Sequence, residues 1–272
     1  MKTYAITGAA SGIGAACASE LIDHGHRVIG VDIQQTDIVC DLSKPDGRRQ
    51  AVDEILEACD GTLDGIITSA GLSSLPSRPG SLIVSVNYFG TVELLTGLRE
   101  GLARSDAGAA VAISSNSVTT TPGVPLAVTE ACLAHDEERA CALADELEMG
   151  PIITYPATKT AVARWVRRNA PTVEWIGEGI TLNAIAPGKI DTPMIAEALA
   201  DPIVGPGAAA WPVPAGRSGR PEEIAHLAAF LLSAQARFFV GSLIYCDGGT
   251  DAEARADDWP VPNPHEWPPK DP

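Results

Sequence analysis

The chain has 272 residues, 45% of them hydrophobic, which suits one α/β domain with a substantial aliphatic core. Its formal net charge of −16 argues against a nucleic-acid partner, which would require a basic stripe. No apolar run approaches the roughly 18 residues of a membrane span. A strand-like segment begins at once, so we expect neither a membrane partner nor a signal peptide.

The cysteines and histidines give no sign of a disulfide framework or a metal site. Six cysteines are scattered without a CxxC pair, and five histidines show no ligand spacing. We therefore expect reduced, mostly buried cysteines, no bound metal and a cytoplasmic location.

Short aliphatic runs alternate with helical patterns along the chain. Most runs are continuously apolar, as expected for parallel strands covered on both faces. The expected strands are Tyr4–Thr7, Arg27–Asp32, Gly65–Ser69, Ala109–Ser114, Thr181–Ala186 and Ser242–Cys246. The expected helices are Ile13–His24, Arg48–Cys59, Val84–Gly101, Pro156–Arg168 and Pro221–Leu232. The alternation predicts the α/β class with a doubly wound parallel sheet of the Rossmann type, whose ligands gather at the carboxyl ends of the strands.

Three segments depart from this alternation. We expect a single domain over 1–250, with a long insert at 116–154 and a segment rich in Pro, Gly and Ala at 189–216, followed by an irregular Pro-rich tail at 251–272. Within the insert, apolar residues recur at i, i+3, i+4 and i+7, which predicts an amphipathic helix. These residues are Ala140, Leu143, Ala144 and Leu147.

A glycine-rich segment, residues 7–14, follows the first strand and opens the first helix. Glycines let the backbone turn tightly and approach a pyrophosphate, and the helix N-terminus supplies free N–H donors. An ordinary glycine-rich turn is the alternative, but the strand–loop–helix context is the one that dinucleotide binding requires. The expected cofactor contacts in this loop are Gly8, Ser11, Gly12, Ile13 and Gly14.

The second strand ends at Asp32. A carboxylate at this place would hydrogen-bond the adenosine ribose and repel a 2′-phosphate, and no arginine adjoins it, so NAD is favoured over NADP as the cofactor. A surface aspartate at a strand end is the alternative. Ile33 adjoins the same site, and Asp41 and Leu42, after the third strand region, would hold the adenine.

Tyr155 and Lys159 are four residues apart at the start of a predicted helix, so their side chains share one face. Pro156 fits only if the helix begins about here, because proline is tolerated in a first turn and not in the interior. A neighbouring ammonium favours the phenolate, so we expect a Tyr155 pKa below its ordinary value of about 10. Without further signals, a tyrosine and a lysine on a helix surface would be the default.

Further signals follow in a fixed order along the chain. They are Thr7-Gly8-x3-Gly12-Ile13-Gly14, Ser69-Ala70-Gly71, Asn87, Ser115, Tyr155-x3-Lys159, Pro187-Gly188 and Thr192. Over roughly residues 2–250 this set resembles the short-chain dehydrogenases/reductases. Within that family it is most similar to the bacterial 3α-hydroxysteroid dehydrogenases/carbonyl reductases, through the stretches 85–90 and 184–188 and the long insert before Tyr155.

The resemblance implies a role for each residue. Tyr155 would exchange a proton with the substrate oxygen while hydride passes to or from the nicotinamide. Lys159 would bind the nicotinamide ribose, and Ser115 would hydrogen-bond the carbonyl or alkoxide. Ser115 is preferred over its neighbour Ser114 because the family usually uses the second residue after the last aliphatic of the strand. Asn87 would hold a water on a proton path from Lys159 to solvent. Further cofactor contacts would come from Ala70, Gly71, Pro187, Gly188, Ile190 and Thr192.

Two features depart from the family pattern. Thr68-Ser69-Ala70-Gly71 stands where Asn-Asn-Ala-Gly is usual, so Ser69 lacks an amide while the Ala-Gly turn is kept. The insert also places Tyr155 unusually far beyond Ser115. It is either a helical decoration or a cover over the helices that many relatives use for dimerisation, which would force a different interface in a homodimer or homotetramer.

Residues 189–216 follow the Pro-Gly motif, where the family carries its substrate lid. Their apolar residues suit a bulky apolar alcohol or ketone, although simple packing of a surface loop is the alternative. We expect NAD-dependent, reversible oxidation of a secondary alcohol, with a 3α-hydroxysteroid or another carbonyl compound as substrate. An aromatic or terpenoid alcohol dehydrogenase remains open. So does a non-catalytic dinucleotide-binding sensor, which would not need to retain Ser115, Tyr155 and Lys159.

Overall fold

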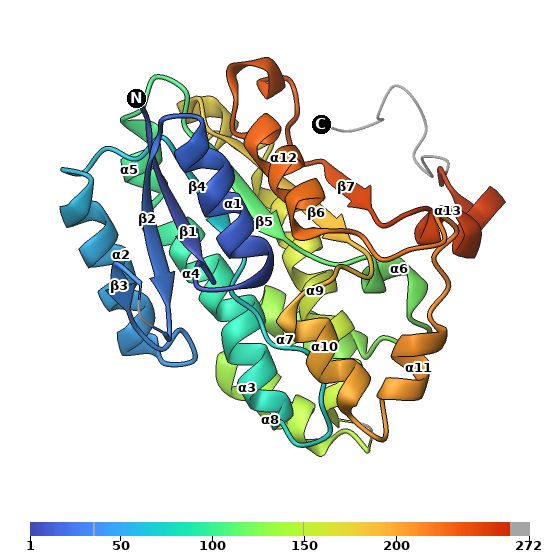
Figure 1. The fold of residues 1–272 in the computed structure, drawn as a ribbon. Helices are drawn as coiled ribbons and strands as arrows, with labels where there is room; N and C mark the ends of the chain where they lie inside the picture. Colours follow the sequence, from blue (N-terminus) through green and yellow to red (C-terminus); the bar gives the residue numbers. More distant parts are fainter. Residues whose placement is uncertain (35, 149, 262–272) are drawn as a thin grey trace, which may run out of the picture.

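The computed structural model describes residues 1–34, 36–148 and 150–261. Within them, seven parallel strands form one sheet in the order β3-β2-β1-β4-β5-β6-β7 (Figure 1). The strands are β1 Thr3–Thr7, β2 Arg27–Asp32, β3 Ile38–Val39, β4 Gly65–Thr68, β5 Ala109–Ile113, β6 Thr181–Pro187 and β7 Leu243–Cys246. The strand order reverses between β1 and β4, and open parallel sheets bind ligands at such a point. The predicted doubly wound parallel sheet is confirmed.

Helices cover both faces of the sheet, because successive strand side chains point to opposite sides. Tyr4 and Ile6 of β1 pack in a cluster with α1 and α12, whereas Ala5 between them packs in a second cluster with α2, α4 and α9 (Figure 1). All the strand residues from Ala109 to Ile113 are buried, which explains their continuous apolar run. All six cysteines are free, and four of them are buried, as predicted.

The helices occupy the following positions. The α-helices are α1 Gly12–Asp23, α2 Pro45–Ala58, α3 Gly80–Val84, α4 Gly90–Gly97, α5 Arg99–Ala103, α6 Ser117–Thr120, α7 Leu126–Leu133, α8 Glu137–Glu146, α9 Gly150–Asn169, α10 Pro193–Ala200, α11 Gly205–Ala210, α12 Pro221–Leu231 and α13 Thr250–Arg255. A π-helical turn, η1, spans Ser85–Phe89, and short 3₁₀ turns are η2 Ile176–Glu178, η3 Ala234–Ala236 and η4 Ala256–Asp258.

Residues 116–154 contain α6, α7, α8 and the start of α9. The amphipathic helix predicted there is α8, whose Ala140 and Ala144 are buried, so this prediction is confirmed. The Thr129 hydroxyl of α7 donates to the Ala157 carbonyl of α9 at 3.1 Å. At the other end, the Asp145 carboxylate accepts from the Ser81 N–H at 2.8 Å. The insert therefore packs on α9 and α3, the two helical segments that lead to Tyr155 and Asn87.

The predicted start of the Tyr155 helix is wrong. It begins at Gly150, six residues before Pro156, which lies inside α9. An interior proline removes one backbone hydrogen bond and costs about 3 kcal/mol. The packing of α9 offsets this cost, since Ala157, Ala161 and Val162 are fully buried against the sheet and the insert. The buried Thr154 hydroxyl also donates to the Gly150 carbonyl at 2.6 Å and so ties the first turn together.

Two other expectations differ from the structure. The helix predicted at 84–101 begins at Gly80 and is divided into α3, η1, α4 and α5, with the π-helical turn centred on Asn87. The predicted irregular tail begins with α13, because the Asp251 carboxylate is buried and forms an ion pair with Arg255 one turn later, at 2.7 Å. Residues 262–272 of that tail lie outside the described residues.

Candidate active site

The glycine-rich loop joins β1 to α1 at the carboxyl edge of the sheet. Gly8 has a φ of +71°, and a Cβ there would lie 2.8 Å from the Ala70 backbone nitrogen. A Cβ on Gly14 would lie 2.1 Å from the Gly8 carbonyl oxygen, so neither position can carry a side chain. Ser11 is the N-cap of α1 and is exposed, with no side-chain capping bond. The N–H groups of the first turn of α1, including those of Ile13 and Gly14, therefore lie at an uncapped helix N-terminus.

Asp32 lies at the end of β2, beside this loop. Its carboxylate accepts hydrogen bonds from the Ala10 N–H at 3.1 Å and the Gln34 N–H at 3.2 Å. Ile33 is exposed next to it. A second acid, Asp37, accepts a hydrogen bond from the N–H of Gly30 at 2.7 Å. Gly30 lies on β2, two residues before Asp32. Sequence reasoning missed Asp37, because its place beside β2 depends on the turn between β2 and β3.

Asp41 and Leu42 follow β3 at the same edge. The Asp41 carboxylate accepts from the Ser43 N–H at 2.9 Å, and hydrogen bonding by Ser43 lowers the pKa of Asp41. Leu42 is buried, and its Cβ lies 3.3 Å from the place that a Cβ on Gly90 would occupy. Asp41 is thus held by Ser43, and Leu42 packs close to Gly90.

Ser115 and Tyr155 come together where β5 ends. Ser115 is the second residue after the strand, and its hydroxyl accepts from the Ser117 N–H at 3.1 Å. Hydrogen bonding by Ser115 also lowers the Tyr155 pKa, so the serine hydroxyl lies next to the phenol. Ser114 points elsewhere, since its hydroxyl donates to the Lys159 carbonyl at 2.9 Å in a buried position. The geometry thus pairs Ser115, and not Ser114, with Tyr155.

Lys159 lies one helical turn beyond Tyr155, and its side chain is 4% exposed. The Nζ atom is 5.8 Å from the centroid of the Tyr155 ring and donates to the Ile113 carbonyl at 2.9 Å. Burial lowers the pKa of Lys159 to about 8, because desolvation disfavours the charged amine.

The pKa of Tyr155 departs from its ordinary value in the direction opposite to the prediction. Burial raises the Tyr155 pKa, and the hydrogen bond from Ser115 lowers it by a smaller amount. The causes of the shift do not include Lys159, whose amine donates to the Ile113 carbonyl. Desolvation therefore dominates, because it disfavours the charged phenolate.

Asn87 is fully buried in the π-helical turn. Its amide oxygen accepts from the Leu72 N–H at 2.7 Å, and its amide nitrogen donates to the Leu72 carbonyl at 3.0 Å. A Cβ on Gly71 would lie 3.3 Å from the Asn87 Oδ1 atom and 3.5 Å from Lys159 Nζ. Gly71 therefore lies between the Asn87 amide and the Lys159 amine, and it has no side chain that would fill the space between them. Next to it, the Ala70 N–H donates to the Thr7 hydroxyl at 3.0 Å, so the Ala-Gly turn is fixed against β1.

The segment after β6 completes the same edge. The Asn116 N–H donates to the Pro187 carbonyl at 2.9 Å, and a Cβ on Gly188 would lie 2.7 Å from the Asp247 Cα. Ile190 is buried. The Thr192 side chain lies 3.3 Å from the place of a Cβ on Gly12, which brings the start of α10 beside the glycine-rich loop.

Two family profiles together match most of the chain. The family profile described as "short chain dehydrogenase" matches residues 2–126, and the one described as "Enoyl-(Acyl carrier protein) reductase" matches residues 143–251. The 3-alpha-hydroxysteroid dehydrogenase/carbonyl reductase of Comamonas testosteroni is 37% identical over 258 residues, 94% of this chain and 98% of that protein. The chain is a short-chain dehydrogenase/reductase.

One further relative and one solved structure are also similar to this chain. The cis-4-hydroxycyclohexanecarboxylate dehydrogenase of Sinomonas cyclohexanicum is 31% identical over 92% of this short-chain dehydrogenase/reductase and 97% of its own length. The crystal structure of the 3-alpha-hydroxysteroid dehydrogenase from Pseudomonas sp. B-0831, complexed with NADH, is 44% identical. It superposes with a TM-score of 0.90, over 93% of this chain and 98% of that one.

The predicted lid of this short-chain dehydrogenase/reductase consists of α10 and α11. The Thr192 hydroxyl accepts from the Ile195 N–H at 3.4 Å and caps α10. Arg78, in the segment after Gly71, forms an ion pair with Glu197 of α10 at 2.7 Å. Lys189 donates to the carbonyl of Ala208 in α11 at 2.9 Å. Sequence reasoning missed Arg78 and Lys189, since neither lies in a recognisable motif.

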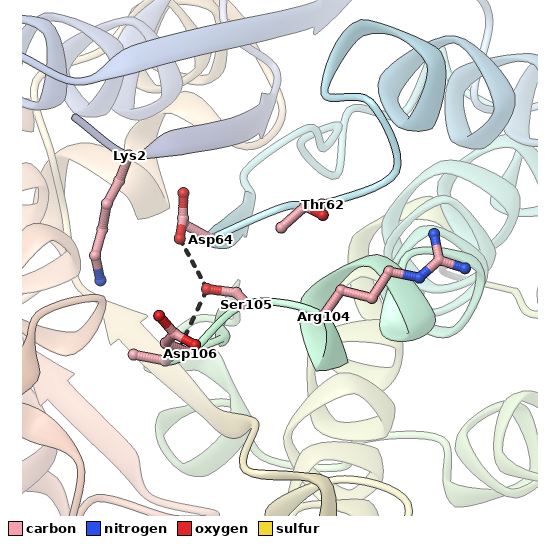
Figure 2. A pocket seen from close by; sticks show the side chains of 7 residues that line it. Lys2, Thr62, Asp64, Arg104, Ser105 and Asp106 are labelled. Carbon is pink, nitrogen blue, oxygen red and sulfur yellow. Dashed lines mark hydrogen bonds between the residues drawn. The ribbon is translucent and has the colours of Figure 1, made fainter.

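A surface hollow of about 310 Å³ lies at the opposite edge of the sheet, where β1 and β4 begin (Figure 2). It is lined by Lys2, Thr62, Asp64, Arg104, Ser105, Asp106 and Ala107. Figure 2 shows the Ser105 hydroxyl directed at Asp64, to which it donates at 2.7 Å. This hollow is separated from Ser115 and Tyr155 by the length of the strands and contains none of the predicted site residues.

Among residues 1–34, 36–148 and 150–261, no group of three or more His, Cys, Asp or Glu side chains is placed to hold a metal ion. In the same ranges, none of the helices combines the length and the apolar character that a bilayer crossing requires.

Proposed function

We propose that this chain is an NAD(H)-dependent oxidoreductase that interconverts a secondary alcohol and a ketone. The single observation that carries the proposal is that Ser115 lies next to the Tyr155 phenol, with Lys159 one turn away, at the same sheet edge as the glycine-rich loop. A sensor that only bound the dinucleotide would not require these three residues.

The residues at this edge fit a dinucleotide. The uncapped N-terminus of α1 offers N–H donors to a pyrophosphate, and the Asp32 carboxylate offers acceptors to ribose hydroxyls. Asp37, close to Asp32, adds a second negative charge that disfavours a 2′-phosphate. We therefore propose NAD and not NADP, and we assign the adenine side to Ile33, Asp41 and Leu42 and the nicotinamide side to Ala70, Gly71, Pro187, Gly188, Ile190 and Thr192.

When bound, NAD supplies the hydride acceptor or donor. Tyr155 exchanges a proton with the substrate oxygen, and Ser115 hydrogen-bonds that oxygen as charge develops on it. Because burial raises the Tyr155 pKa, the phenol is protonated at neutral pH and ready to protonate a ketone oxygen. In the alcohol-to-ketone direction the phenol must first lose its proton, so turnover in this direction rises with pH.

Lys159 and Asn87 complete the proposed proton path. The Lys159 amine, with a pKa of about 8, can accept and release a proton near neutral pH. In our proposal it also holds the nicotinamide ribose, and Asn87 positions a water that links the amine to solvent.

A bulky apolar alcohol or ketone is the proposed substrate, with a 3α-hydroxysteroid as the first choice. Two similar proteins carry that activity in their names, and the lid carries apolar residues such as Met194, Leu199 and Ile203. An aromatic or terpenoid alcohol is the second candidate. We further propose a cytoplasmic homodimer or homotetramer, and the division into a domain at 1–250 with an insert, a lid and a tail.

A substrate panel tests the proposal. Purified protein is incubated with NAD and, in turn, a 3α-hydroxysteroid, a terpene alcohol and an aryl alcohol, and NADH absorbance is followed. We expect the highest kcat/KM for the steroid and little turnover when NADP replaces NAD. Absence of turnover on the whole panel, despite measurable NAD binding, would contradict the proposal in favour of a non-catalytic sensor.

A further inference from the structure

Arg48 of α2 is a charged side chain held almost completely inside the molecule, with 1% of its surface exposed. Its guanidinium contacts four other segments of the chain. The NH1 group donates to the Glu137 carboxylate at 3.0 Å, the Ser85 carbonyl at 3.4 Å and the Leu42 carbonyl at 3.5 Å. The NH2 group lies 2.6 Å from the other Glu137 oxygen, and Nε lies 2.7 Å from a Glu93 oxygen.

One of these contacts, together with a further contact to an aromatic ring, joins Arg48 to the π-helical turn that contains Asn87. Arg48 donates to the carbonyl of Ser85, the first residue of the turn, and its guanidinium carbon lies 5.7 Å from the ring centroid of Phe89, the last residue. π-helical turns are rare and are often found at functional sites. Arg48 thus contacts the first and the last residue of the irregular turn that carries Asn87, whose amide bonds to Leu72 and lies near Lys159.

The carboxylates that balance Arg48 come from α4 and from the insert. Glu93 belongs to α4, and Glu137 is the first residue of α8. Their side chains are 29% and 26% exposed, so both are partly withdrawn from solvent. Removing one partner of a buried ion pair is destabilising, and without Glu137 only Glu93 would be left to balance the buried guanidinium. The insert therefore supplies a charge on which the position of Arg48 depends.

We propose that Arg48 is a positioning residue, which couples the insert through Glu137 to the π-helical turn and so keeps Asn87 aligned with Lys159. The proposal rests on the proposed function, in which Asn87 and Lys159 form a proton path. It gives the insert a part in catalysis that is independent of any subunit interface. Arg48 also contacts the Leu42 carbonyl. Because the π-helical turn receives two contacts from Arg48, we expect the turn to move when Arg48 is displaced.

The decisive variant is Glu137→Gln, which keeps the shape of the side chain and removes its charge. Glu130→Gln is the matched control, since Glu130 also belongs to the insert and pairs with Arg164 of α9 at 3.0 Å, but in an exposed position. Both variants are compared with the intact wild-type protein. The measurements are kcat, KM for the alcohol, the NAD Kd, the solvent deuterium isotope effect on kcat, and amide hydrogen exchange at residues 85–90.

We expect Glu137→Gln to lower kcat about 10-fold while the NAD Kd changes by less than about 2-fold, because small displacements of a positioned group are costly to rate. The solvent isotope effect should rise, since proton movement becomes slower than the other steps, and amides 85–90 should exchange faster. Glu130→Gln should match the wild type in all of these. Arg48→Lys, which keeps the charge but loses the planar fork, should resemble Glu137→Gln.

An unchanged kcat and unchanged exchange in folded Glu137→Gln would overturn the proposal. So would an equal loss of kcat in Glu130→Gln, or a loss of NAD affinity as large as the loss of kcat. If Arg48→Lys fails to fold, Glu137→Gln still decides. If the wild type oxidises no alcohol, the proposed function fails, and exchange at residues 85–90 still decides whether Glu137 controls the turn.

Discussion

The two edges of the parallel sheet both carry charged and hydroxyl side chains, but they use them differently. At the amino edge the Asp64 carboxylate accepts a hydrogen bond from the Ser105 hydroxyl (Figure 2) and another from the Thr3 N–H, so it is satisfied by its neighbours. At the carboxyl edge, burial shifts the pKa values of Tyr155 and Lys159 in opposite directions. Polar composition alone therefore does not identify a functional site. A functional site is indicated where ionisable groups are buried side by side and neighbouring glycines leave the backbone free of side chains.

The first test pairs a serine from each edge. Ser115→Ala removes the hydroxyl that touches the Tyr155 phenol, and Ser105→Ala removes the one that touches Asp64. Loss of a donor to the developing oxyanion costs about 10²- to 10³-fold in kcat, so we expect that loss for Ser115→Ala. Ser105→Ala should keep the wild-type kcat. Steady-state rates with NAD and the best alcohol provide the measurement, and equal rates for the two variants would remove the distinction between the edges.

The second test pairs two lysines and measures stability. Lys159 titrates at about 8 when folded, against 10.5 as the ordinary value. Between these two pH values the unfolded chain binds more protons than the folded one, so this group makes the free energy of unfolding rise with pH. Since one pKa unit corresponds to about 1.36 kcal/mol, the rise is about 3 kcal/mol. Below pH 8 the amine is charged in both the folded and the unfolded state, so through this group the free energy of unfolding no longer changes with pH.

Buried thiols act in the opposite direction over the same range, since burial raises the pKa of Cys40 from 9.0 to about 11. The informative quantity is therefore the difference between wild type and Lys159→Met in urea unfolding at pH 8 and pH 10.5. We expect that difference to grow by about 3 kcal/mol in favour of the wild type. Lys2→Met, which removes a lysine at the amino edge, is the matched control. A difference for Lys159→Met that does not change with pH would mean that Lys159 is not desolvated.

The third test pairs two aspartates and concerns the cofactor. Asp32→Ala removes the proposed acceptors for the ribose hydroxyls and one charge that opposes a 2′-phosphate. Hydrogen bonds to charged groups contribute about 1.5–3 kcal/mol, so we expect the preference for NAD over NADP to fall about 10- to 100-fold. Asp106→Ala, at the amino edge, should keep the preference. Comparison of kcat/KM for the two cofactors is the measurement, and an unchanged ratio in Asp32→Ala would refute the assigned role.

The sequence was informative where local rules act and silent where packing overrides them. The continuous run at Ala109–Ile113 and the glycines at 8 and 14 follow from strand burial and backbone sterics, so the sheet and the loop could be predicted. Pro156 is in the interior of α9 because burial against the sheet and insert outweighs its local cost. The π-helical turn has no local signature, since it depends on Arg48 and Glu137, which are far apart in the chain.

The central claim is that the Tyr155 phenol exchanges the proton of the reaction. Tyr155→Phe keeps the ring and removes only the hydroxyl that touches Ser115. We expect it to lower kcat by about 10³-fold or more and to leave the NAD Kd within about 2-fold of the wild type. Turnover of Tyr155→Phe at a rate near that of the wild type would contradict the account.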